Sequence, residues 1–272
     1  MKIEAILKDK NVHTIDKDQL LSEALEKMEK NGIAHIIVTD DDKLVGVISI
    51  RDIADRLGST KTERISPAGL HISSAMSTNL ITTESDIDVE DAANLMLKEK
   101  IGSLAVTIKT DETEELVGII TKMDMVRLCS KVDTIQVSQI MTQNPYYINS
   151  TDRVIHARKI MFENRVSTLP VFEEGELVGI VDYNSIAKAL ARFREATPKH
   201  HQNERIRHFL VNQVMNTAPP SLKPDATVSE AAEFMLNEGL KGIPVFDESE
   251  DLIGIVTKTD MTELVANKFQ TD

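Results

Sequence analysis

An apolar strand with a glycine at its centre occurs four times along the chain. The glycines are Gly46, Gly118, Gly179 and Gly254, and each follows Leu-Val or Leu-Ile and precedes two β-branched residues. Short runs of this composition favour β-strands. Because one pattern returns at intervals of about 60 to 75 residues, the sequence predicts an array of similar structural units.

A helical pattern precedes each glycine strand. Apolar residues recur there at spacings of three and four, which places them on one face of a helix, and each set ends on a methionine. The sets are Leu21, Ala24, Leu25 and Met28; Val89, Ala92, Ala93 and Met96; Val154, Ala157 and Met161; and Val228, Ala231, Ala232 and Met235. At this spacing we interpret the methionines as core side chains rather than as ligand or metal contacts.

A second apolar stretch and an acidic turn lie between each helix and its glycine strand, which predicts two strands joined by a hairpin. A further helix follows each glycine strand, for example over residues 123–129 and 259–267. Each unit is therefore predicted to be an α/β (α+β) unit with the order strand, helix, strand, strand, helix. Such a unit is too small to bury both faces of its sheet alone, so we expect the units to pair.

Composition and charge narrow the function. The 272 residues are 41% hydrophobic and 28% charged, a balance typical of a chain with a real core. The net charge of −13 repels nucleic-acid phosphates, which disfavours a nucleic-acid partner. No apolar run approaches the ~20 residues that cross a bilayer. Cys129 is the single cysteine, which fits a reducing compartment, and we expect a cytoplasmic protein.

Three of the helices that follow glycine strands begin with the same chemistry: a hydroxyl, a nearby cation, and a carboxylate three residues after the hydroxyl. The sets are Ser49, Arg51 and Asp52; Thr121, Lys122 and Asp124; and Thr257, Lys258 and Asp260. A phosphate there would meet the hydroxyl, free backbone N–H groups and the positive end of the helix dipole. A carboxylate has two acceptor oxygens, which suits the two hydroxyls of a ribose. The same residues are also an ordinary helix cap, so both interpretations stay open.

This order of motifs resembles the CBS domain, named after cystathionine β-synthase. Four copies cover residues 2–57, 72–129, 137–191 and 211–267. The resemblance implies two paired (Bateman) modules, at residues 1–130 and 137–272, similar in plan to the γ subunit of AMP-activated protein kinase. It also implies that adenosine ligands bind in clefts between paired repeats, with AMP first and ADP, ATP or S-adenosylmethionine as alternatives.

In that family the hydroxyl contacts phosphate and the aspartate holds the ribose, and the resemblance assigns these roles to the three sets. The phosphate role falls to Ser49, Thr121 and Thr257, the ribose role to Asp52, Asp124 and Asp260, and Arg51, Lys122 and Lys258 are possible phosphate cations. The third repeat departs from the pattern, with Asp182 at the hydroxyl position and Ser185 at the carboxylate position. A carboxylate would repel phosphate, so we expect this site to be empty or to bind an uncharged ligand.

Other chemistry is sparse. His200, His201 and His208 lie in a polar linker with no acidic or cysteine partner at ligand spacing, so no metal site is predicted. The sequence has no Gly-rich phosphate loop or nucleophile elbow, and we expect no enzyme and no catalytic cofactor. The leading hypothesis is a regulatory sensor of adenosine nucleotides that changes module orientation and so signals to an unidentified protein partner. A sensor of S-adenosylmethionine and a ligand-independent scaffold that forms homodimers are the alternatives.

Overall fold

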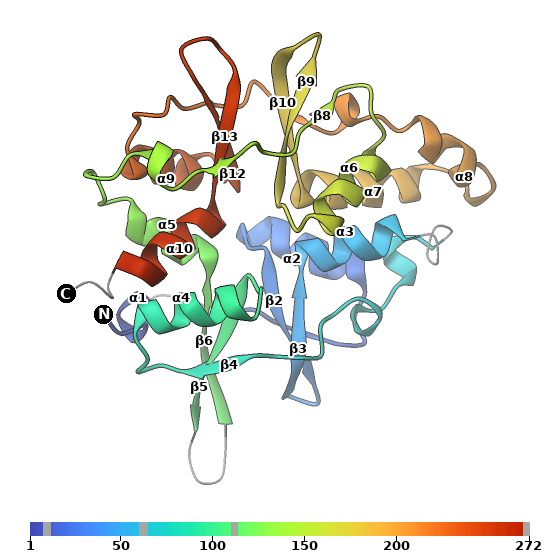
Figure 1. The fold of residues 1–272 in the computed structure, drawn as a ribbon. Helices are drawn as coiled ribbons and strands as arrows, with labels where there is room; N and C mark the ends of the chain where they lie inside the picture. The colour runs from blue at the N-terminus through green and yellow to red at the C-terminus, as the bar shows by residue number, and fades with distance from the viewer. Residues whose placement is uncertain (8–11, 60–64, 110–113, 269–272) are drawn as a thin grey trace. The chain divides into compact units, whose positions relative to one another are not determined.

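The computed structural model describes residues 1–7, 12–59, 65–109 and 114–268, which belong to two compact units (Figure 1). Unit 1 consists of Met1–Val12, Ile81–Pro145 and Pro220–Asp272, and unit 2 consists of His13–Leu80 and Tyr146–Pro219. Most of the second and fourth repeats therefore lies in unit 1 and most of the first and third lies in unit 2, whereas the first residues of each repeat belong to the other unit. The modules expected at residues 1–130 and 137–272 are a different division of the chain, and they stay a prediction.

Both repeats of unit 2 have the predicted order of strand, helix, strand, strand and helix. The first consists of β1 (Thr14–Asp16), α2 (Leu21–Asn31), β2 (His35–Asp40), β3 (Lys43–Ser49) and α3 (Ile50–Gly58). The third consists of β8 (Ile148–Asn149), α6 (Val154–Glu163), β9 (Thr168–Glu173), β10 (Glu176–Asp182) and α7 (Tyr183–Ala196). The remaining elements are η2 (Pro67–Gly69), η3 (Ile72–Ser74), η5 (Lys199–His201), α8 (Gln202–Arg205), η6 (Ile206–His208), η7 (Val211–Gln213) and β11 (Asn216–Thr217).

The two repeats of unit 1 have the same order of strand, helix, strand, strand and helix, except that the fourth repeat lacks the first strand. The second repeat consists of β4 (Thr82–Glu84), α4 (Val89–Lys98), β5 (Ser103–Lys109), β6 (Glu114–Thr121) and α5 (Lys122–Cys129). The fourth consists of α9 (Val228–Asn237), β12 (Gly242–Phe246), β13 (Leu252–Thr257) and α10 (Lys258–Lys268), and a single parallel bridge between Leu222 and Val245 replaces its first strand. The remaining elements are α1 (Glu4–Leu7), η4 (Val137–Gln139) and β7 (Thr142–Gln143). No described helix is both long and apolar enough to cross a membrane.

Each hairpin of a repeat is antiparallel and contains a register shift beside its glycine. In the first repeat Val38 pairs with Gly46 but Thr39 pairs with Leu44, which leaves Val45 as an extra residue. The other three hairpins shift at the same place. Such a bulge bends the strand and increases its twist. The recurring apolar-Gly pattern therefore encodes a bulged strand as well as a buried one.

The glycines are explained by segments that lie against them. Ser77, near the start of the second repeat, exchanges backbone hydrogen bonds with Val47 of the first repeat. β7 lies near the start of the third repeat but pairs with β13 of the fourth, and β11 lies near the start of the fourth repeat but pairs with β10 of the third. A Cβ atom on Gly46 would overlap the carbonyl oxygen of Ser77. Glycine is therefore required because another backbone approaches the strand closely.

The predicted helix faces form the cores. One hydrophobic cluster lies in each unit, and the terminal methionines of the four helix patterns are buried in these clusters, as the sequence predicted. In unit 2, α3 packs against α7, and in unit 1, α10 packs against α4 and α5. Each unit is thus held together by helices of two repeats, which fits the expectation that one repeat cannot bury its apolar surface alone.

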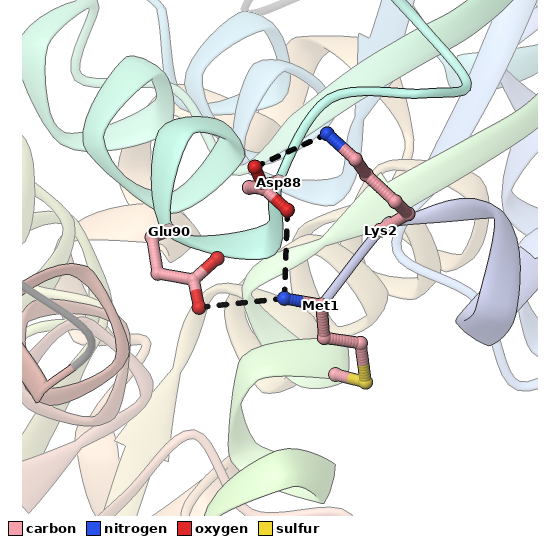
Figure 2. A network of polar contacts seen from close by, with 4 residues as sticks. All are labelled: Met1, Lys2, Asp88 and Glu90. Carbon is pink, nitrogen blue, oxygen red and sulfur yellow. Dashed lines mark hydrogen bonds and ion pairs between the residues drawn. The ribbon is translucent and has the colours of Figure 1, made fainter. Parts of the chain in front are cut away.

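The first residues of the chain are tied to α4 of the second repeat (Figure 2). Lys2 Nζ donates a hydrogen bond to Asp88 at 3.1 Å, and the amino group of Met1 lies 3.5 Å from the same carboxylate and 3.7 Å from that of Glu90. These pairs hold the pKa of Asp88 below its ordinary value, with the Lys2 hydrogen bond as the largest cause. Ile3 is completely buried beside them, so the apolar contact holds the segment while the ion pairs remain solvated.

Replacing Gly46 with alanine should lower the free energy of unfolding by about 1–3 kcal/mol, because the added methyl group overlaps backbone that cannot move without losing hydrogen bonds. Gly118→Ala is the matched control, since its nearest neighbour is the end of the Leu7 side chain, 2.8 Å from the added Cβ. That side chain can rotate, and the loss should be smaller. Urea unfolding of both variants measures the difference, and equal losses would contradict this account of the glycine.

Candidate functional site

The chain turns from a glycine strand directly into a helix at each of the predicted hydroxyl positions. Ser49 ends β3 and caps α3, and Thr121 ends β6 and caps α5, both with extended backbone. Thr257 ends β13 and immediately precedes α10. Each hydroxyl therefore lies where the first backbone N–H groups of a helix have no helical partner, which is a place that attracts negative charge.

The carboxylate of each set folds back onto its hydroxyl residue. Oδ2 of Asp52 accepts hydrogen bonds from the Ser49 backbone N–H at 2.8 Å and from its hydroxyl at 2.6 Å. The Thr121–Asp124 pair makes the same two bonds at 2.7 and 2.8 Å. Both distances are 2.6 Å for Thr257 and Asp260. The capping interpretation is thus realised in all three repeats, and in each of them it uses one carboxylate oxygen.

The second carboxylate oxygen distinguishes the three repeats. Oδ1 of Asp124 accepts a hydrogen bond from Arg127 at 3.0 Å, and Oδ1 of Asp260 accepts one from the hydroxyl of Thr142 at 2.9 Å. In the part of the chain that the structure describes, no hydrogen bond reaches Oδ1 of Asp52. The first repeat therefore keeps a whole acceptor oxygen for another group.

These carboxylates are largely withdrawn from water. Asp124 and Asp260 are only 5% and 6% exposed. Burial raises the pKa of Asp260 above its ordinary value, and the hydrogen bonds from Thr257 and Thr142 oppose that rise. Burial likewise raises the pKa of Asp52 against the hydrogen bonds from Ser49. A desolvated carboxylate gains from each further donor that reaches it.

The candidate cations are engaged inside their own units. The guanidinium of Arg51 lies 4.7 Å from the centroid of the Phe162 ring and 5.6 Å from that of Tyr183, both in the third repeat. Nζ of Lys122 donates to the hydroxyl of Thr259 at 3.2 Å. The side chain of Lys258 is half-buried. Arg51 therefore serves the packing of the first repeat on the third, and a phosphate role for these cations stays a prediction.

The third repeat uses its aspartate in a different way. Asp182 accepts the backbone N–H of Ser185 at 2.8 Å, and the Ser185 hydroxyl donates to the Asp182 carbonyl at 3.0 Å. Opposite Asp182 in the hairpin, the buried Thr168 hydroxyl has no hydrogen-bond partner within the described residues. Here the acid caps the helix itself, so a carboxylate replaces the hydroxyl where a phosphate would arrive.

Sequence reasoning missed Arg127 and Thr142 because neither belongs to a hydroxyl-plus-acid set. Thr142 lies near the start of the third repeat, 118 residues from Asp260. A signal was nevertheless present, since a methionine followed by a small polar residue occurs near the start of three of the repeats, as Met76-Ser77, Met141-Thr142 and Met215-Asn216. The imidazole rings of His200 and His201 lie 4.0 Å apart, and the described residues hold no group of three potential metal ligands.

Four segments, residues 3–59, 72–131, 137–192 and 211–267, match the CBS domain family. Protein MJ1225 of Methanocaldococcus jannaschii is 24% identical over 283 residues, which cover 98% of this chain and 99% of that protein. Its crystal structure, described as that of a proposed archaeal homologue of γ-AMPK, matches with a TM-score of 0.83 at 22% identity and covers 97% of this chain and 99% of that one.

Two further proteins are similar over nearly the whole chain. Protein MJ1404 of the same organism is 30% identical over 268 residues, which cover 95% of this chain and 60% of that protein. The crystal structure of an uncharacterised conserved protein from Pyrococcus horikoshii matches with a TM-score of 0.63 at 20% identity, over 97% of this chain and 100% of that one. The two structural matches show that the fold of nearly the whole chain recurs in other proteins.

The buried aspartate of the fourth repeat should give stability a distinct pH dependence. Because the pKa of Asp260 is raised from 3.8 in the folded protein, its favourable contribution is complete below pH 3.8 and is lost as pH rises through the folded pKa. Acidification from pH 7 toward pH 3.8 should therefore stabilise the wild-type protein relative to Asp260→Asn, as measured by the difference in Tm. Asp88→Asn is the control of opposite sign, since the pKa of Asp88 is lowered.

Proposed function

The chain belongs to the CBS domain family, and we propose that it is a non-catalytic regulatory sensor that binds adenosine nucleotides, with AMP first and ADP and ATP as relatives. The similar proteins include one described as a proposed archaeal homologue of γ-AMPK, which supports a regulatory role. The buried Cys129 is the single cysteine, and we place the protein in the cytoplasm. The pairing of repeats into modules over residues 1–130 and 137–272 is part of this proposal.

The carboxylate of Asp52 is the observation that carries the proposal. It is positioned by two hydrogen bonds from Ser49, its pKa is raised by burial, and its Oδ1 has no partner in the described residues. A capping box alone needs one carboxylate oxygen. The neighbouring hydroxyls of a ribose would satisfy the other, and the adjoining N-terminus of α3 would receive the phosphate.

The mechanism that follows is a shift in population. A ligand that contacts one arrangement of the protein better than another moves the equilibrium toward that arrangement by its difference in binding free energy. The surface that changes would be offered to a protein partner. The third repeat, with its acid at the phosphate position, takes no part in nucleotide binding.

Two other functions make different predictions. A sensor of S-adenosylmethionine would use the same aspartates for the ribose but would need no phosphate contact. A scaffold that forms homodimers would ignore all adenosine compounds. A thermal-shift panel separates them, since a ligand at 100 times its Kd adds about 2.7 kcal/mol of stability.

Asp52→Asn should weaken AMP binding at the first repeat roughly tenfold or more, because a hydrogen bond to a charged group contributes about 1.5–3 kcal/mol. Asparagine keeps one acceptor oxygen for the capping bonds, so the fold should survive. Isothermal titration calorimetry gives the affinity and circular dichroism gives the fold. Ser185→Ala in the third repeat is the matched control and should leave AMP binding unchanged. A folded Asp52→Asn protein with wild-type affinity for AMP would leave only the capping role.

A further inference from the structure

Thr142 connects the fourth repeat to a segment that belongs elsewhere in the sequence. Its hydroxyl donates to Oδ1 of Asp260 at 2.9 Å, and its backbone pairs with Ile255 in the two-residue strand β7. The segment that carries it is the start of the third repeat. Thr142 itself is exposed, whereas Asp260 is 6% exposed.

Most of the hydrogen-bond acceptor positions of the Asp260 carboxylate are already occupied. A carboxylate offers about four lone-pair positions, two on each oxygen. The N–H and hydroxyl of Thr257 occupy Oδ2, and Thr142 occupies one position on Oδ1. One position remains, while the two neighbouring hydroxyls of a ribose need two. A ribose can therefore bind in full only if one existing donor leaves.

Thr142 is the donor that can leave at the smallest cost. The Thr257 N–H is fixed by the backbone at the start of α10, and the Thr257 hydroxyl belongs to the same capping box. The Thr142 hydroxyl comes from an exposed residue, so rotation of one side-chain torsion delivers it to water. Because no donor from the described residues reaches Oδ1 of Asp52, we expect no displacement in the first repeat.

We propose that the Thr142 hydroxyl occupies part of the ribose site of Asp260 and must be displaced before a nucleotide binds the fourth repeat. This inference rests on the proposed function. The hydroxyl acts as a restraint on affinity at one repeat, and it makes the hydrogen bonding at the start of the third repeat depend on whether the fourth repeat is occupied.

The test is calorimetric titration of the full chain with AMP at pH 8. The binding step that disappears in the Asp260→Asn variant is assigned to the fourth repeat. Thr142→Val keeps the β-branched shape and the strand pairing but removes the donor. It should tighten that step roughly threefold to tenfold, because no hydrogen bond to a charged group must be broken first. Thr142→Ser keeps a hydroxyl and should restore wild-type affinity.

Asn216→Val is the matched control. Asn216 on β11 pairs with Ile180 of the third repeat, just as Thr142 on β7 pairs with Ile255 of the fourth. Because Asn216 lies beside the third repeat, its substitution should leave the Asp260-dependent binding step unchanged. If Thr142→Val leaves the affinity of the Asp260-dependent step unchanged or lowers it, the proposed restraint by Thr142 is wrong, whereas nucleotide binding at the fourth repeat still stands. If wild-type protein shows no step that Asp260→Asn removes, nucleotide binding at this repeat fails and the restraint fails with it.

Discussion

A carboxylate withdrawn from water at the start of a helix is the interaction on which both the fold and the site depend. Asp52, Asp124 and Asp260 each complete the first turn of a helix through a hydroxyl residue at the end of a strand. Because such a group loses hydration, it must be supplied with donors. The cap supplies donors to one oxygen only. If a donor from the protein also reaches the other oxygen, the aspartate serves only as a helix cap. If none does, that oxygen can accept hydrogen bonds from another group.

The four repeats differ in the groups that surround the acidic side chain at the start of the helix. In the first repeat no donor from the described part of the chain reaches the second oxygen of Asp52, whereas Arg127 covers that position in the second repeat and Thr142 covers it in the fourth. The third replaces the hydroxyl with Asp182, which caps its helix without help from a second acid. One architecture therefore presents carboxylates with unequal surroundings, and single side chains beside them make the difference.

The helix faces and the capping pairs could be predicted from the sequence because they depend on residues that are close together along the chain. The helix faces that end in Met28, Met96 and Met161 are fixed by the 3.6-residue period, and those residues are buried as predicted. The hydroxyl and acid of each cap lie three residues apart, which is within one helical turn. The repeat order followed from the same local patterns, and the similarity of the whole chain to the CBS domain family agrees with it.

The sequence by itself determined the repeats, their helices and hairpins, and the capping pairs, since each depends on residues that are neighbours along the chain. Only the tertiary structure decided that β7 joins the fourth repeat, that Arg51 stacks on Phe162 and that Thr142 reaches Asp260. These contacts join residues more than 100 positions apart, and no local periodicity records which distant segment will fill a given strand edge. That choice is made when the apolar helix faces pack, because packing alone brings those segments together.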